Sequence, residues 1–246
     1  MWILIFILIL IGLVLCLPRA AEAKEVAWSY CGENGPEHWA ELSKEFAAAI
    51  GNAQSPVDIA SEMVRQNQGR PISFHYSPGG YTVLDNGHTL LMVPDDKAAS
   101  YIVLGEETYH LQQFHFHVPS EHTVNGVPYD MEIHFVHRNA DGDLAVVGLL
   151  VCEGAENELI ARSWAVAPET AGEDAVRVDG VYDPAHFLPA NLDNIQYCGS
   201  LTTPPTVEGV TWVLLKEHGE ASKDQLEHFL RVIGENARPV QRGIRQ

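Results

Sequence analysis

The chain has 246 residues, of which 46% are hydrophobic and 20% are charged. This apolar content is enough to build a core, so the composition excludes an intrinsically disordered chain. The 15 basic and 33 acidic residues give a formal net charge of −18, and such an acidic surface excludes nucleic acid and anionic membranes as expected partners. Twelve histidines, most of them in the middle of the chain, direct the search for a functional site.

The N-terminus has the pattern of an export signal. Residues 1–17 are apolar or glycine and are followed by Pro18 and Arg19, and Ala21 and Ala23 then occupy the two positions that a signal peptidase reads. We therefore expect a signal peptide over residues 1–23 and one domain over residues 24–246, exported to the periplasm or secreted. No Lys or Arg precedes the apolar run, so an uncleaved N-terminal anchor that tethers the domain to a membrane is the alternative.

Short stretches with a period of two predict β-strands from residue 72 onward. Asp85-Asn86-Gly87 is a strong hairpin signal between two of them, and Asn125-Gly126 predicts a turn between two later ones. Strands are expected over residues 72–76, 81–84, 88–93, 101–104, 109–118, 131–137, 144–151 and 210–216.

Helices are few in the predicted structure. Trp39, Leu42 and Phe46 fall on one face of a short N-terminal helix, and residues 159–166 predict another. Ser222 and Gln225 form a capping-box pattern ahead of a third. The expected fold class is mainly β, an α+β roll: a single domain built on one large, mostly antiparallel twisted sheet with a few peripheral short helices.

Histidines recur on one face of two predicted strands. In Gln113-Phe114-His115-Phe116-His117, alternation places Gln113 and the two histidines on one face and the phenylalanines on the other. Glu132 and His134 likewise share a face of the next strand. The connection between the strands contains a turn, so we expect antiparallel pairing with opposite Cβ atoms about 4.5–5.5 Å apart. At that spacing three imidazoles can reach one ion.

Three imidazoles and a water form the tetrahedral site with one open position that is typical of catalytic zinc. We therefore predict that His115, His117 and His134 bind Zn²⁺. Gln113 and Glu132 each lie two residues before a ligand on the same face, where they would accept the other ring N–H and orient the imidazole. Ordinary core or surface histidines are the competing interpretation, which a single His-x-His pair would favour but three histidines with two polar partners do not.

Further motifs extend this pattern along residues 24–246. They are Asn34-Gly35-Pro36-Glu37-His38-Trp39, Gln54-Ser55-Pro56-Val57-Asp58-Ile59, Asn86-Gly87-His88, Ser120-Glu121-His122-Thr123-Val124, Gly199-Ser200-Leu201-Thr202-Thr203-Pro204-Pro205 and Arg238-Pro239-Val240-Gln241. Together with the histidine strands they resemble the α-class carbonic anhydrases, and Val118-Pro119 is similar to the bacterial branch of that family.

The resemblance implies an enzyme, a carbonic anhydrase, that reversibly hydrates carbon dioxide to bicarbonate and a proton by means of a zinc-bound hydroxide. Thr202 matches the residue that orients this hydroxide, and Glu121 matches its partner. An ionised Glu121 can only accept a hydrogen bond, so the Thr202 hydroxyl would donate to it.

The resemblance also implies residues for substrate and for proton transfer. Thr203 would contact bicarbonate, and the apolar wall beside the carbon dioxide would be formed by Val136, Val146, Leu201 and Trp212. His88 matches the proton shuttle, since an imidazole with an unperturbed pKa of about 6.5 can pass protons to buffer. Tyr30 matches a residue that helps to order the water chain.

Three cysteines remain after removal of residues 1–23, so at least one is unpaired in a monomer. Cys152 ends a predicted strand and is expected to be a small packing residue. If a disulfide forms in the exported domain, we expect it between Cys31 and Cys198. The sequence leaves both a monomer and a homodimer open.

Two other function classes remain as alternatives. A non-catalytic carbonic-anhydrase-like binding domain typically lacks a zinc histidine, whereas His115, His117 and His134 are all present. A cupin-type iron protein also uses His-x-His, but it does not account for the block at residues 199–205. Metal analysis separates the three classes, because they predict one zinc, no metal and iron.

Overall fold

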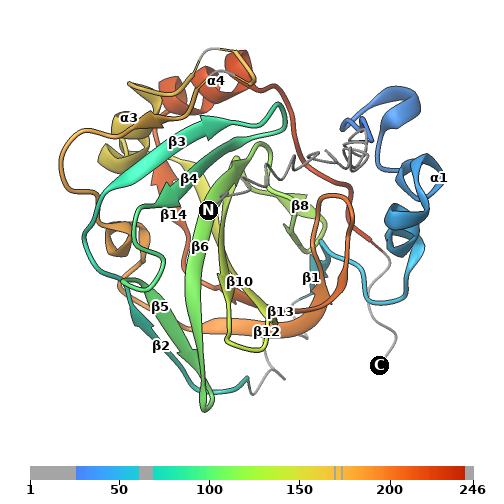
Figure 1. Cartoon of the computed structure of the whole chain (residues 1–246), viewed down its shortest axis with the longest axis horizontal. Helices are drawn as coiled ribbons and strands as arrows, with labels where there is room; N and C mark the ends of the chain where they lie inside the picture. The colour runs from blue at the N-terminus through green and yellow to red at the C-terminus, as the bar shows by residue number, and fades with distance from the viewer. Residues whose placement is uncertain (1–25, 61–68, 169, 173, 242–246) are drawn as a thin grey trace, which may run out of the picture.

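The computed structural model describes residues 26–60, 69–168, 170–172 and 174–241. The predicted signal peptide over residues 1–23 lies outside these residues. The described chain forms one large twisted sheet with short helices at its periphery (Figure 1), which confirms the predicted fold class. None of its helices is long and apolar enough to cross a bilayer.

The main sheet has eleven strands in the order β11-β3-β4-β6-β9-β10-β13-β12, with β5 joining β2 to β6 and β14 pairing with β10. Pairing is antiparallel except that β13 and β14 both lie parallel to β10. The strands are β2 (Ile72–His75), β3 (Tyr81–Asp85), β4 (Leu90–Pro94), β5 (Tyr101–Leu104), β6 (Glu107–His117), β9 (Met131–Arg138), β10 (Leu144–Glu153), β11 (Val176–Arg177), β12 (Asn194–Ser200), β13 (Glu208–Leu215) and β14 (Gly219–Ala221). Every predicted strand is therefore present, with small shifts at the ends, and β12 is the longest strand that was not predicted.

A small second sheet has the order β1-β7-β8. Its strands are β1 (Asp58–Ile59), β7 (Thr123–Val124) and β8 (Val127–Pro128). The predicted turn joins β7 to β8, where Asn125 and Gly126 have φ of 52° and 80°. Two consecutive positive φ values are what a tight two-residue hairpin loop requires, and Asn-Gly meets that requirement.

The central pair β6 and β9 has one face in the main core and the other toward a cavity. Phe114 and Phe116 are fully buried in the core, as are Ile133 and Phe135 opposite them. A β-bulge between Leu111 and Gln113 shifts the register at the start of this pairing. From Gln113 onward the alternation is regular, so the histidines share the face away from the core.

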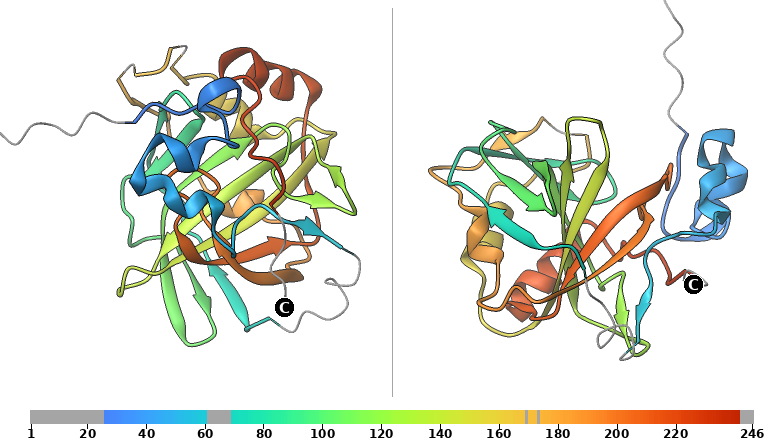
Figure 2. Two further views of the ribbon diagram at one scale, coloured as in Figure 1. Left: turned by 90° about the vertical axis from the view of Figure 1, so that its right-hand side faces the viewer. Right: turned by 90° about the horizontal axis from the view of Figure 1, so that it is seen from below.

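The helices lie at two edges of the molecule (Figure 1). Helices α3 (Glu158–Trp164) and α4 (Lys223–Val232) pack together at one edge, and α1 (Trp39–Leu42) lies on the opposite side. The 3₁₀ helices are η1 (Gly32–Asn34), η2 (Lys44–Ile50) and η3 (Pro184–Phe187). Figure 2 shows the segment that follows α4 running across to the N-terminal helices, where Gln241 N–H donates to the Pro56 carbonyl at 2.8 Å.

One predicted helix differs from the structure, and the predicted start of another is confirmed. The single N-terminal helix is two short elements, because Ser43 is extended (φ −157°, ψ 149°) and its hydroxyl caps η2 by accepting from Glu45 N–H. The predicted capping box of Ser222 and Gln225 is present at the start of α4. Each of these serines satisfies a backbone N–H that the first helical turn leaves without an intrahelical partner.

The predicted Cys31–Cys198 bridge is not formed. Cys31, Cys152 and Cys198 all carry free thiols in the described chain. Cys31 precedes η1 and Cys198 lies in β12 with both side chains exposed, whereas a disulfide needs Cβ atoms about 3.8 Å apart. Cys152 is half-buried at the end of β10, with Sγ 3.2 Å from His218 Nδ1.

One histidine belongs to the core face of β9. His137 is fully buried, its Nε2 lies 3.0 Å from the Tyr76 hydroxyl, and the two rings stack with their centroids 5.8 Å apart. Burial lowers the pKa of His137 to about 3, because the charged imidazolium loses its hydration there. The side chain is therefore neutral in the folded protein.

His137 should make the protein less stable in mild acid. Below pH 6.5 the unfolded chain binds a proton at His137 that the folded chain does not bind until about pH 3, so the free energy of unfolding decreases as the pH falls through this window. The decrease approaches about 1.4 kcal/mol per pH unit for one group. Urea titrations at pH 4 to 6 give the free energy of unfolding at each pH. Its slope against pH should be lower by about this amount in His137→Gln than in wild type, and it should be unchanged in the control variant His186→Gln, at an exposed position. Equal slopes in wild type and His137→Gln would contradict the assignment.

Candidate metal centre and active site

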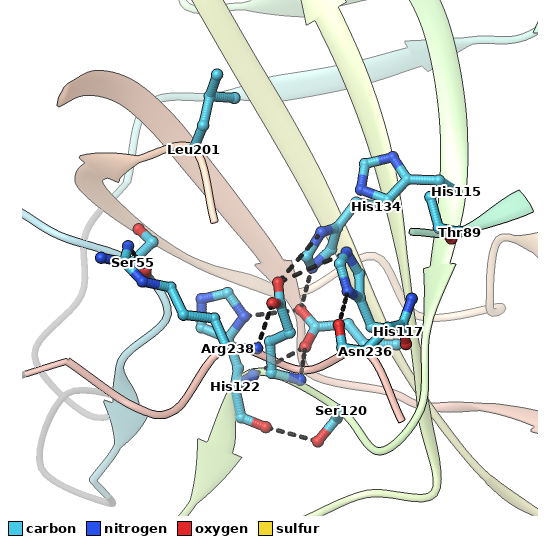
Figure 3. A network of polar contacts seen from close by, with 12 residues as sticks. Ser55, Thr89, His115, His117, Ser120, His122, His134, Leu201, Asn236 and Arg238 are labelled. Atoms are coloured by element: carbon cyan, nitrogen blue, oxygen red, sulfur yellow. Dashed lines mark hydrogen bonds and ion pairs between the residues drawn. The ribbon is translucent and has the colours of Figure 1, made fainter. Parts of the chain in front are cut away.

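Three imidazoles meet on the cavity face of β6 and β9 (Figure 3). The register places His115 directly opposite His134, and His117 lies two residues further along β6. One ring nitrogen of each lies within 4.8 Å of the other two. The structure therefore brings the three predicted ligands together.

Hydrogen bonds decide which nitrogen each ring presents. His115 Nδ1–H donates to Gln113 Oε1 at 2.8 Å, and His117 Nδ1–H donates to the Asn236 carbonyl at 2.8 Å. His134 Nε2 lies 2.9 Å from Glu132 Oε1. The nitrogens left to face one another are thus Nε2 of His115, Nε2 of His117 and Nδ1 of His134, and contacts of this kind fix a ligand's tautomer and orientation.

Two properties of the site fit a metal ion: the imidazoles are neutral, and a buried ring nitrogen lacks a hydrogen-bond partner. Burial lowers the pKa of all three imidazoles, to about 4 for His117, so that they are neutral as metal ligands must be. His117 Nε2 is buried and has no hydrogen-bond partner among the described residues. An unpartnered buried acceptor is costly, and coordination would satisfy it. Three nitrogen donors with an open position suit zinc.

A second group of metal-capable residues, His122, Glu132 and His134, is a hydrogen-bonded network instead. Glu132 Oε2 accepts from the backbone N–H groups of Glu121 and His122 at 3.0 and 2.9 Å, and Oε1 accepts from His122 Nδ1–H at 2.7 Å. Burial alone would raise the pKa of Glu132, but the contacts with His122 and His134 outweigh it and hold that pKa well below its usual range. The carboxylate is already satisfied and has no oxygen left for an ion.

The network continues away from the site. His122 Nε2 lies 2.6 Å from the Tyr197 hydroxyl, on the side of the ring away from Glu132. The Tyr197 hydroxyl is also hydrogen-bonded to Ser55 Oγ at 2.8 Å. Ser55 Oγ in turn accepts from Ser200 N–H at 3.1 Å. This chain of hydrogen bonds connects the histidine strands to the end of β12, just before Thr202.

Glu121 lies behind two of the imidazoles. Its Oε1 accepts from Arg238 N–H at 2.8 Å, and its Oε2 lies 3.6 Å from His117 Nε2 and 3.8 Å from His134 Nδ1. Burial raises the pKa of Glu121 to about 7, opposed by His134, by the Thr202 hydroxyl and by the Arg238 N–H. Thr202 is buried and also lines the cavity. It therefore lies between this carboxyl group and the cavity.

A cavity of about 350 Å³ opens beside the imidazoles. His115 and His134 line it. So do all of the predicted substrate-binding residues, which are Thr202, Thr203, Val136, Val146, Leu201 and Trp212. Trp212 is held in place by a hydrogen bond from Nε1–H to the Ser200 carbonyl at 2.9 Å. The lining thus combines polar and apolar side chains.

Comparison with known families decides the chain's membership. A sequence model described as eukaryotic-type carbonic anhydrase matches residues 34–246. The chain belongs to the eukaryotic-type (α) carbonic anhydrase family. It is therefore an enzyme of carbon dioxide hydration, and the iron cupin alternative is excluded.

Bacterial carbonic anhydrases are among its relatives. A carbonic anhydrase of Nostoc sp. is 40% identical over 230 residues, covering 92% of this chain and 86% of the relative. One of Klebsiella pneumoniae is 40% identical over 216 residues, covering 87% of each. The solved α-carbonic anhydrase of Thermovibrio ammonificans, in complex with the inhibitor sulfanilamide, is 43% identical with a TM-score of 0.84, and the match covers 88% of this chain and 96% of that one.

The two residues predicted for proton transfer do not line the carbonic anhydrase cavity. The His88 ring stacks on Trp28 with centroids 3.6 Å apart and an angle of 11° between the planes. Tyr30 lies edge-on to His88 at 6.4 Å. The Tyr30 hydroxyl is buried without a hydrogen bond among the described residues, and burial followed by the negative charge of Glu121 raises its pKa well above the usual range. Tyr30 therefore contacts the His88 ring and lies near enough to Glu121 to be affected by its charge.

Asn236 is a part of the site that sequence reasoning missed. Besides orienting His117, it accepts from Val118 N–H at Oδ1 (2.8 Å). It also donates from Nδ2 to the carbonyls of Phe116 (2.9 Å) and His88 (3.0 Å). It joins β6 to the loop that carries His88. The only signal in the sequence is its position two residues before the Arg238 motif.

Arg238 is the second missed residue, although its motif was recognised. Its side chain is 2% exposed and donates to Gln54 Oε1, the Ser55 carbonyl and the Ala49 carbonyl at 2.9, 2.7 and 3.0 Å. The guanidinium lies over the Trp39 ring, 5.3 Å from its centroid. Burial lowers its pKa to about 10, so it remains charged at neutral pH. Arg238 therefore contacts the N-terminal segment with its side chain and Glu121 with its backbone N–H.

Proposed function

We propose that this enzyme hydrates carbon dioxide with a Zn²⁺ ion held by His115, His117 and His134, and that His88 relays the proton to solvent. The observation that carries the proposal is the convergence of three neutral imidazoles, with one ring nitrogen of each within 4.8 Å of the others, beside a cavity lined by both polar and apolar side chains. Bound there, zinc would supply a nucleophile at neutral pH by lowering the pKa of a coordinated water to about 7, the value known for carbonic anhydrases.

Gln113, Glu132 and Asn236 keep the three rings in place. Each takes up the ring nitrogen that does not face the cavity, at 2.8, 2.9 and 2.8 Å. Because Glu132 is itself held by two backbone N–H groups and by His122, it cannot turn away from His134. The rings therefore need no rearrangement before each turnover, which is the form of preorganisation that lowers a reaction barrier.

The charge of Glu121 decides whether the Thr202 hydroxyl donates or accepts in the hydrogen bond between them. Hydrogen bonds from the Thr202 hydroxyl and the Arg238 N–H favour the ionised carboxylate of Glu121, because both oppose the effect of burial on its pKa. An ionised carboxylate only accepts, so the Thr202 hydroxyl donates to it. The Thr202 oxygen then accepts from the cavity side, which orients the nucleophile's remaining lone pair toward the substrate.

The cavity walls suit the substrate and the product differently. Carbon dioxide has no net dipole and can rest against Val136, Val146 and Leu201 without losing hydrogen bonds. Bicarbonate is an anion that needs donors, and the Thr203 hydroxyl lines the same cavity. A wall that binds the neutral substrate without solvating the product favours product release.

His88 is suited to remove the proton that each turnover releases. Direct release to water from a group with a pKa of about 7 is limited to roughly 10³ per second, even with reassociation near 10¹⁰ per molar per second. Carbonic anhydrases reach about 10⁶ per second, so a relay is needed. An imidazole can carry the proton at neutral pH, and the aromatic stack with Trp28 holds this one next to Tyr30.

The cellular setting stays a prediction. Export directed by residues 1–23 would place the enzyme in the periplasm or outside the cell, where it would exchange carbon dioxide and bicarbonate without a nucleic-acid or membrane partner.

Stopped-flow hydration of carbon dioxide tests the proposal. The zinc-loaded enzyme should accelerate hydration, chelation should remove the acceleration, and zinc should restore it. His117→Ala should reduce the rate to background even with zinc, while the exposed His186→Ala should remain active. Full activity in the chelated protein or in His117→Ala would refute the metal assignment.

The proton relay has a separate test. His88→Ala should lower kcat severalfold or more in dilute buffer and leave kcat/KM for carbon dioxide unchanged, because proton transfer follows substrate conversion. Added imidazole should restore kcat. An unchanged kcat in His88→Ala at low buffer would show that another group carries the proton.

A further inference from the structure

A thiol and an imidazole lie in contact at the end of β10, outside the active-site cavity. Cys152 Sγ is 3.2 Å from His218 Nδ1. Cys152 is the penultimate residue of β10, and His218 directly precedes β14, the short strand that lies parallel to this end of β10. The two residues are 66 positions apart in the sequence, so only the pairing of these strands brings them together. Neither lines the cavity, and neither has a part in the proposed reaction.

Two carboxylates flank this pair. Glu220 lies directly opposite Cys152 in the register of β10 and β14, and its Oε2 accepts from Ala155 N–H at 3.0 Å. Asp130 Oδ2 accepts from the N–H of Glu153, the residue after Cys152, at 2.7 Å. One oxygen thus holds each carboxylate at the end of β10. The other oxygen of each makes no hydrogen bond or ion pair within the described residues, so it is available to a ligand.

The charges around the thiol favour a bound cation over a free thiolate. Partial burial, followed by the negative charges of Glu220 and Asp130, raises the pKa of the Cys152 thiol above its usual value. At neutral pH the thiol therefore keeps its proton and is a poor nucleophile, since the thiolate is the reactive form. A metal ion reverses this balance, because it replaces the proton on sulfur and is attracted by the same two carboxylates.

The separation of 3.2 Å between sulfur and nitrogen is close to what a tetrahedral ion requires. With bonds of about 2.3 Å to sulfur and 2.0–2.1 Å to nitrogen, a tetrahedral zinc ion holds the two atoms about 3.5 Å apart. The exposed His218 side chain can move outward by this small difference. His218 Nδ1 also lies 3.3 Å from the Gly219 carbonyl, just beyond the usual hydrogen-bond range, so little is lost when this nitrogen turns to a metal.

We propose that Cys152 and His218 form a second, surface metal site for a thiophilic divalent cation such as Zn²⁺, with a further oxygen ligand from Glu220, Asp130 or water. On binding, the Cys152 sulfur loses its proton to solvent and forms a bond to the metal, and the lone pair of His218 Nδ1 forms the second bond. A thiolate and an imidazole select this class of ion over Mg²⁺ and Ca²⁺, which prefer oxygen ligands. The site lies outside the cavity, so it does not depend on the proposed function.

Protection from alkylation tests the proposal on the native chain, with its other thiols as internal controls. Zinc-loaded enzyme freed of excess metal is treated with iodoacetamide, and peptide mass spectrometry follows each cysteine. Added Zn²⁺ at ten times its dissociation constant should slow alkylation of Cys152 about tenfold, because only the metal-free thiol reacts. Cys31 and Cys198 are exposed and make no hydrogen bond with an imidazole in the described part of the chain, so their rates should not change. Mg²⁺ should protect none of the three.

Cobalt identifies the ligands. Thiolate-bound Co²⁺ has a charge-transfer band in the near ultraviolet, which a site of three imidazoles does not give, so the band reports the surface site alone. Co²⁺ should produce this band in the Cys31→Ser/Cys198→Ser variant, and adding Cys152→Ser should abolish it. In the same background His218→Gln should weaken Co²⁺ binding about tenfold or more, whereas the exposed control His186→Gln should not.

Several outcomes would overturn the proposal. Equal alkylation of Cys152 with and without Zn²⁺ would show that no metal binds its sulfur, and an equal slowing of all three cysteines would show only nonspecific binding to thiols. A cobalt band that survives Cys152→Ser, or Co²⁺ binding that is undiminished in His218→Gln, would show that the ion lies elsewhere.

Discussion

The register between β6 and β9 is the constraint on which the rest of the site depends. Side chains alternate across a strand, so a slip of one residue would move His115 and His117 into the core and expose Phe114 and Phe116. The phenylalanines prevent this, because they are fully buried against the residues opposite them. Burial of the aromatic face therefore fixes the position of the imidazole face. The same packing stabilises the sheet and positions the histidines.

The register alone brings the rings together but does not orient them. Orientation comes from polar groups beside the rings, above all the Asn236 carbonyl, which is distant in sequence, and the Glu132 carboxylate, two residues before His134. Each of these two residues has hydrogen bonds of its own, which hold it in position. His117 Nε2, by contrast, is buried without a hydrogen-bond partner among the described residues. In a low-dielectric interior such an atom is costly to leave unpaired, which favours a ligand at the open position of the site.

Much of this arrangement could be predicted from the sequence, because it depends on local periodicity. The alternation in residues 113–117 and 132–134 was enough to group the three histidines and to assign Gln113 and Glu132 to their face. The strand β12 was missed because Asn194-Ile195-Gln196-Tyr197-Cys198-Gly199-Ser200 has few apolar residues, and only the partner strand β13 makes it a strand. The break at Ser43 was missed because the apolar spacing of Trp39 and Phe46 suits both one helix and two short ones.

Long-range contacts could not be predicted in the same way. Arg238 reaches Ala49 and Ser55 across almost the whole chain, and Asn236 reaches His88. No spacing or composition marks such pairs. For the same reason the sequence suggested a contact between Cys31 and Cys198 that the fold does not make, since both thiols are free.

The central claim is that three imidazoles and one open position hold the metal. Zinc-edge X-ray absorption of the loaded enzyme tests it most directly. The account predicts three nitrogen neighbours with imidazole scattering at about 2.0–2.1 Å and one further oxygen. A sulfur neighbour near 2.3 Å, or fewer than three imidazoles around the ion, would contradict it.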